Sequence, residues 1–139
     1  MILADSSAWV EYDRATGSPV HRRLKELISR GEDLVVTEPV IMELVAGARD
    51  DEREVRLRRL LRRVELLRFD PAIDFDGASR IYRRCRQVGI TPRGIVDCMI
   101  ASVALRHDAS LLAQDADMER LAAVVGIRLD DASADHGTT

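Results

Sequence analysis

Short aliphatic runs alternate along this chain with segments whose apolar residues recur at helical spacing. This alternation restricts the possible folds more than any other feature. The runs fall at Ile2–Ala4, Leu34–Val36, Glu65–Phe69, Ser110–Ala113 and Ile127–Leu129. Strands that alternate with helices build a mostly parallel sheet covered by helices. We therefore expect a single α/β domain at residues 1–130, with a central sheet of four to five strands flanked by helices. A flexible tail is expected at 131–139, where the residues are small and polar.

Capping signals indicate where several helices begin. Ser6 or Ser7 is expected to cap a helix that starts near position 8, and Asp74 a helix that runs to about position 88. A further helix is expected within residues 93–117, beginning after Pro92 and Gly94. The last helix, at about 118–125, is expected to have Asp117 as its N-cap.

The bulk properties exclude several classes of protein. A chain of 139 residues is the size of one domain, and no apolar run approaches the ~20 residues of a membrane span. The start, Met-Ile-Leu-Ala-Asp, has no basic region typical of a secretory signal, so a cytoplasmic location is expected. Cys85 and Cys98 lack zinc-site spacing and are interpreted as buried thiols.

The positive charge is almost entirely arginine. The net charge is −3, so there is no global basic signature for nucleic acid, yet 20 of the 21 basic residues are arginine. Arginine suits phosphate recognition, but GC-rich coding explains the same bias equally well. The arginine-rich segments at 53–63 and 80–86 therefore remain open to three interpretations: RNA contact, protein contact or a solvated face.

Five acidic residues lie just after a buried strand, at a helix start or, for Glu43, on the helix that follows the second strand. They are Asp5, Glu43, Asp97, Asp115 and Asp117. Each taken alone is more often a cap or a solvated side chain. Together they come from four separate segments near the carboxyl edge of the expected sheet, where ligands bind in open α/β folds. Clustered carboxylates need a counter-charge, and a hard divalent cation such as Mg²⁺ or Mn²⁺ supplies it.

Four stretches in the same order resemble the PIN-domain family, and specifically VapC-type toxins of bacterial toxin–antitoxin pairs. They are Ile2–Trp9, Glu38–Leu44, Thr91–Ala101 and Gln114–Asp117. The resemblance implies a metal-dependent endoribonuclease that cleaves structured RNA such as tRNA or rRNA and so inhibits translation and growth.

The resemblance also assigns roles to individual residues. It implies that Asp5, Glu43, Asp97 and Asp115 form a catalytic quartet, with Asp5, Asp97 and Asp115 as ligands of Mg²⁺ or Mn²⁺. Ser7 and Asp117 would support this site, and Arg93 would contact RNA or a partner. The chain departs from the family pattern at three positions without losing a carboxylate: Ser6 replaces a usual threonine, Gly94 a common serine and Met118 a common aromatic residue.

The same resemblance implies a cognate VapB-type antitoxin, a homodimer, and a heterotetramer or larger assembly with the antitoxin. The alternative function is a catalytically silent PIN-like module that binds RNA or antitoxin. Phosphatases of the haloacid-dehalogenase type and phospho-receiver domains are disfavoured, because Lys25 is the chain's only lysine and stands far from the position that either site needs.

Overall fold

The computed structural model describes residues 1–135, and four strands and seven α-helices alternate within them. In chain order they are β1 (Ile2–Ala4), α1 (Ser6–Asp13), α2 (Pro19–Arg30), β2 (Leu34–Val36), α3 (Glu38–Ala46), α4 (Asp51–Leu61), β3 (Glu65–Leu66), α5 (Pro71–Gln87), α6 (Ile95–Arg106), β4 (Ser110–Leu112), α7 (Ala116–Val125) and a 3₁₀ helix, η1 (Asp131–Asp135). The expected α/β domain with a four-stranded sheet is confirmed.

The sheet is parallel throughout, in the order β3-β2-β1-β4. Leu3 lies opposite Val35 of β2 on one side and Leu111 of β4 on the other. The chain therefore moves outward from β1 to β3 and then returns to place β4 beside β1. This reversal of direction makes the carboxyl ends of β1 and β4 the place where an open α/β sheet holds its ligands.

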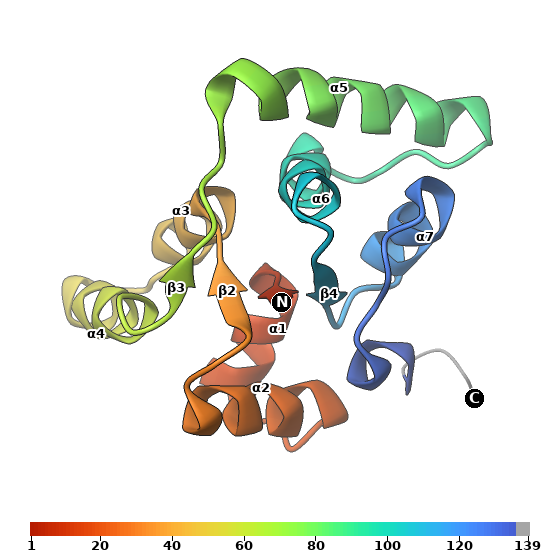
Figure 1. Cartoon of the computed structure of the whole chain (residues 1–139). Coiled ribbons are helices and arrows are strands. Elements are labelled where there is room, and N and C mark those ends of the chain that lie inside the picture. Colours follow the sequence, from red (N-terminus) through yellow and green to blue (C-terminus); the bar gives the residue numbers. More distant parts are fainter. Residues whose placement is uncertain (136–139) are drawn as a thin grey trace.

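The core is aliphatic, with Trp9 as its largest fully buried side chain. Figure 1 shows α5 along one end of the molecule and α2 at the other, with the sheet between them. Helices α5 and α6 pack together closely. Gly77 permits this, because a Cβ at that position would lie 2.3 Å from Ser102 Oγ. Cys85 and Cys98 are buried free thiols, as expected.

Besides β4, which ends one residue early at Leu112, two expected strands are shorter than their apolar runs. The strand expected at Glu65–Phe69 ends at Leu66, and the Phe69 amide donates instead to Glu38 Oε1 at 2.7 Å. The expected strand at Ile127–Leu129 contributes only an isolated parallel bridge between Leu111 and Leu129. Both segments lie at the margins of the sheet, where side chains and loops compete with the ladder for backbone hydrogen bonds.

Three expected caps are wrong in the same way. Asp5 rather than Ser6 or Ser7 caps α1, Asp70 rather than Asp74 caps α5, and Asp115 rather than Asp117 caps α7. In each case the true cap is an aspartate with extended backbone that lies one to four residues before the expected one. Its carboxylate reaches the free N–H groups of the first turn.

Part of the expected tail is ordered. Residues 131–135 form η1, which packs against α2 and β4, and the fully buried Ser133 accepts a hydrogen bond from the Ala113 amide at 2.9 Å. The rest of that tail, 136–139, lies outside the described residues. Within residues 1–135, no helix is both long and apolar enough to cross a lipid bilayer.

Candidate active site

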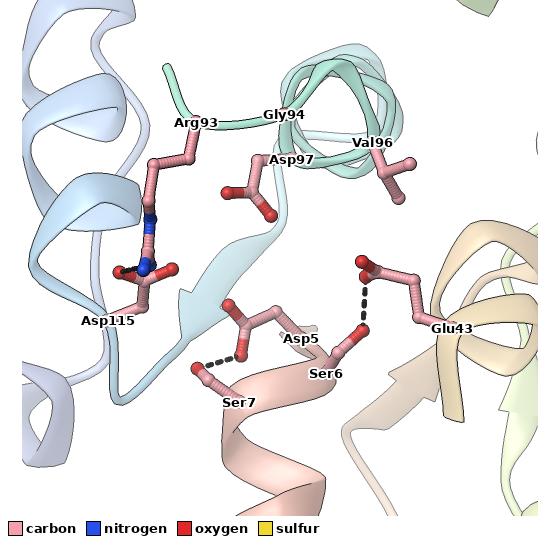
Figure 2. A pocket seen from close by; sticks show the side chains of 9 residues that line it. All are labelled: Asp5, Ser6, Ser7, Glu43, Arg93, Gly94, Val96, Asp97 and Asp115. Atoms are coloured by element: carbon pink, nitrogen blue, oxygen red, sulfur yellow. Dashed lines mark hydrogen bonds and ion pairs between the residues drawn. The ribbon is translucent and has the colours of Figure 1, made fainter. Parts of the chain in front are cut away.

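A pocket of about 390 Å³ opens at the carboxyl edge of the sheet, where β1 and β4 end. It is lined by Asp5, Ser6, Ser7, Glu43, Arg93, Gly94, Val96, Asp97 and Asp115. The four acids expected to form a quartet therefore share one pocket. Figure 2 shows Asp5 and Asp97 facing each other across it, with Glu43 and Asp115 on opposite sides.

Asp5 lies deepest in the pocket, with only 2% of its surface exposed. Its Oδ1 accepts hydrogen bonds from the Ala8 amide at 3.0 Å and from the Ser7 hydroxyl at 2.6 Å. Ser7 Oγ in turn accepts from the Gln114 amide at 2.8 Å, just beyond β4. Ser7 thus links the ends of β1 and β4 and holds Asp5 in one orientation, while its supporting role in catalysis stays a prediction.

The charge of Asp5 and Asp97 is poorly compensated. Burial, reinforced by repulsion from Asp97 and Asp115, raises the pKa of Asp5 to about 7 despite its two hydrogen bonds. Burial together with repulsion from Asp115 and Glu43 raises the pKa of Asp97 to about 6, and the nearby Arg93 only partly offsets this. Asp97 lies in the first turn of α6, where the helix dipole favours a carboxylate. The site therefore has an unmet demand for positive charge.

Glu43 reaches the pocket from α3. Its Oε1 accepts a hydrogen bond from the Ser6 hydroxyl at 2.6 Å, so a residue next to Asp5 orients this second acid (Figure 2). From the sequence, Ser6 was expected to be a helix cap and was noted in place of a usual threonine, with no predicted contact to Glu43. Its position could have indicated this contact. Ser6 directly follows Asp5 at the end of β1, and β2, the parallel neighbour of β1, leads into α3, which carries Glu43.

Arg93 contacts the acids that follow β4. Its Nη2 donates to Asp115 Oδ1 at 2.8 Å, and its Nε pairs with Asp117, which Arg120 also contacts. The Arg93 side chain is 71% exposed, whereas Asp115 is 16% exposed. Asp117 lies beside the pocket and is absent from the residues that line it. The sequence analysis did not anticipate Arg120; the expected contact of Arg93 with RNA or a partner stays a prediction.

The carboxylate oxygens of the pocket suit a hard divalent cation, although the side chains as placed do not surround a common metal position. Between residues 1 and 135, no group of three or more acidic, histidine or cysteine side chains is placed to hold a metal ion. Asp115 is paired with Arg93, and Glu43 with Ser6. All four acids nevertheless offer carboxylate oxygens, the ligands that Mg²⁺ and Mn²⁺ prefer. The raised pKa values of Asp5 and Asp97 indicate a shortage of positive charge that such an ion would relieve.

Asp5 should make the metal-free protein less stable as pH rises. Its pKa is about 7 in the folded state against 3.8 for a free aspartate, so the stabilisation from a protonated Asp5 is complete below pH 4 and lost by pH 8. The expected loss is at most on the order of 4 kcal/mol. Urea unfolding in EDTA at pH 5 and pH 8 measures the part of this loss that falls above pH 5, about 3 kcal/mol, with Asp5→Asn removing this contribution and the exposed Asp76→Asn retaining it. Equal pH dependence in all three proteins would contradict the assignment.

Comparisons with known proteins are consistent with this arrangement. The PIN domain family model matches residues 2–124. The ribonuclease VapC11 of Mycobacterium tuberculosis and the VapC ribonuclease Mb1587 of Mycobacterium bovis are each 43% identical over 129 residues, covering 92% of this chain and 96% of theirs. The ribonuclease VapC32 of M. tuberculosis is 33% identical over 130 residues, covering 93% of this chain and 96% of its own.

Solved structures share the fold at lower identity. A VapBC2 complex from Rickettsia felis, bound to a promoter DNA fragment, aligns with a TM-score of 0.75 at 19% identity, covering 94% of this chain and 98% of the other. A DNA-bound VapBC complex from Salmonella typhimurium aligns at 0.72 and 21% identity, covering 94% and 97%. Because the PIN domain model matches most of the chain and VapC ribonucleases are 43% identical along nearly its whole length, this chain belongs to the PIN-domain family and, within it, to the VapC group.

Proposed function

We propose that this chain is a metal-dependent endoribonuclease and the toxin of a toxin–antitoxin pair, acting in the cytoplasm. Its substrate would be a structured RNA such as tRNA or rRNA, whose cleavage inhibits translation and growth. The VapC ribonucleases that resemble it over nearly its whole length support the enzymatic part. Metal dependence is supported by the chemistry of the site, whereas the class of RNA is what the resemblance to VapC-type toxins implies.

The observation that carries the proposal is the convergence of four carboxylates in one pocket. Asp5, Glu43, Asp97 and Asp115 come from four segments and line the same cavity. Two of them have pKa values raised by burial and mutual repulsion. A fold gains no stability from such an arrangement, because uncompensated buried charge is costly. Binding a cation is the function that explains it.

Each residue has a distinct task in this proposal. Asp5, Asp97 and Asp115 would hold Mg²⁺ or Mn²⁺, which when bound activates water and stabilises charge on the attacking and leaving oxygens. Ser7 fixes the orientation of Asp5, and Ser6 that of Glu43. Glu43 lies at the side of the pocket, where its carboxylate would orient the attacking water and accept its proton.

A VapB-type antitoxin is the proposed partner. Structural neighbours of this chain include VapBC complexes from S. typhimurium and R. felis. We propose that this chain likewise forms a homodimer that joins its antitoxin in a heterotetramer or larger assembly. Because the pocket is strongly acidic, an antitoxin side chain that reached into it would have to be cationic.

Metal dependence can be tested with the purified chain and end-labelled tRNA and rRNA fragments. We expect cleavage with Mg²⁺ or Mn²⁺, none in EDTA, and recovery when excess Mn²⁺ is restored. Cleavage that continues in EDTA would contradict a metal-dependent mechanism. RNA binding without cleavage in either metal would favour the alternative, a silent binding module.

A further inference from the structure

A second and larger cavity adjoins the acidic pocket. It is a groove of about 960 Å³ between α1, α2, α3 and α4, and it shares Ser6 and Glu43 with the acidic pocket. A polymer that lay in this groove would therefore reach the acidic site directly. We refer to this cavity as the α1–α4 groove.

The walls of the α1–α4 groove are positively charged, in contrast to the chain as a whole. Five basic and two acidic side chains line it, whereas the net charge of the protein is −3. The basic residues are Arg14, Lys25, Arg49, Arg53 and Arg56. Only Arg53 is paired, with Asp13 at 3.4 Å; the other four make no ion pair with any residue from 1 to 135. Four unpaired cations in one groove favour a polyanionic ligand.

The floor of the α1–α4 groove adds aromatic rings and an unused donor. The chain has five Phe, Tyr and Trp residues, and two of them, Trp9 and Tyr12, line this groove. Tyr12 also contacts the His21 ring, at a centroid distance of 6.0 Å. Trp9 is 1% exposed, and its indole Nε1 has no hydrogen-bond partner among residues 1–135. Because Trp9 and its indole nitrogen are both buried, the ring that this groove offers to a ligand is Tyr12.

We propose that the α1–α4 groove binds a single-stranded segment of RNA beside the scissile phosphate, an inference that rests on the proposed ribonuclease function. Proteins that hold single strands combine a basic groove for the backbone with aromatic rings on which bases stack. The groove has both features and leads to the acidic pocket. Loops of structured RNA supply unpaired nucleotides of this kind. The arginine-rich segment at 53–63 therefore has a specific assignment, through Arg53 and Arg56.

Binding of fluorescein-labelled oligouridine of twelve nucleotides tests the proposal, measured by anisotropy across a salt series. The full chain carries Asp5→Asn and the buffer contains EDTA, so the probe is not cut. The groove variant is Arg14→Ala/Arg49→Ala/Arg56→Ala. Each lost phosphate contact lowers the salt slope by about 0.7, so the slope should fall by about 2 and the affinity by about 100-fold at 0.1 M salt.

Two further variants separate specific contacts from general charge. Arg83→Ala/Arg84→Ala/Arg86→Ala removes three exposed arginines from α5, at another side of the molecule (Figure 1), and should change the affinity less than about threefold. Tyr12→Leu removes a ring but no charge, and should weaken binding about 5- to 100-fold at an unchanged salt slope. Equal losses in the α5 and groove variants would overturn the proposal, because the attraction would then be non-specific.

Cleavage kinetics separate a failure of the groove from a failure of the ribonuclease function. In chains with Asp5 intact, the groove variant should raise KM and keep kcat. If the parent cleaves RNA and the groove variant has the same KM and affinity, the groove proposal fails alone. If the parent binds RNA through the groove but never cleaves it, the ribonuclease function fails and the groove stands. If the groove variant loses a VapB-derived peptide but keeps RNA, the groove is a peptide site and the proposal is overturned.

Discussion

Asp5→Asn should lower the rate of RNA cleavage by about 10³-fold and leave the fold intact. Asp5 is the most buried acid of the pocket and is held by hydrogen bonds from Ser7 and Ala8. Loss of a ligand charge at a divalent-metal site removes several kcal/mol of transition-state stabilisation, which corresponds to about three orders of magnitude in rate. Asparagine keeps the oxygen that accepts from Ala8 and Ser7, so α1 keeps its cap. Single-turnover cleavage with saturating Mn²⁺ measures the loss.

The control must separate charge at the site from charge elsewhere. Asp76→Asn removes a carboxylate from the exposed face of α5, where it pairs only with Arg80, and should leave the rate unchanged. The Asp5→Asn protein should also unfold at the same or a higher temperature in EDTA, because it lacks the cost of a buried charge. Full activity in Asp5→Asn would remove Asp5 from the catalytic set, and lower activity together with unfolding would identify it as structural.

The gathering of the acids was predictable because it depends on topology. Parallel strands end at one edge, so acids placed just after β1 and β4 had to lie near each other once the alternation of strands and helices was recognised. Asp97 and Glu43 followed from the helices that pack at that edge. The prediction therefore needed only strand direction and the order of elements.

The detailed hydrogen bonding was not predictable, because it depends on backbone angles at each helix start. Asp5, Asp70 and Asp115 all have extended backbone and accept from the first turn, whereas the caps expected from the sequence were nearby residues of similar capping propensity. The pairing of Ser6 with Glu43 joins positions 37 residues apart. Propensity scales contain no information on such a contact. The ion pair of Arg93 with Asp115, which are 22 positions apart, is another example.

The expectation that Asp74 caps a helix was wrong, and the contacts that Asp74 makes instead lead to a second prediction with a large effect. Asp74 is not a cap but a fully buried carboxylate within α5. Its oxygens accept from Ser102 Oγ at 2.8 Å, Arg106 Nε at 3.1 Å and Nη2 at 2.7 Å, and the Asp70 amide at 2.8 Å. Burial alone would raise the pKa of Asp74, but these hydrogen bonds, above all those from Arg106, outweigh it and lower the pKa. The network joins α5 to α6.

Asp74→Ala should destabilise the protein by about 3–5 kcal/mol, the cost of leaving a partner charge and a hydroxyl unpaired. Arg106, whose side chain is 27% exposed, would lose its carboxylate partner and keep only the Arg68 carbonyl among the hydrogen bonds described for residues 1–135, and the buried Ser102 would lose its acceptor. Urea unfolding at pH 7 should show a much lower midpoint with an unchanged m-value. RNA cleavage below the unfolding transition should persist, because the network is not part of the acidic pocket.

Asp76→Ala gives the matched comparison, since it removes an aspartate two residues away in the same helix. Asp76 pairs with Arg80 at 2.7 Å, the same distance as between Asp74 and Arg106. Both side chains of the Asp76–Arg80 pair, however, are more than half exposed. Exposed pairs contribute little, so the expected cost is below about 0.5 kcal/mol. A double-mutant cycle with Arg106→Ala should then show coupling for Asp74 and none for Asp76. Equal costs for the two alanine variants would mean that burial of the pair does not set its contribution, and that α5 and α6 are held together by apolar packing alone.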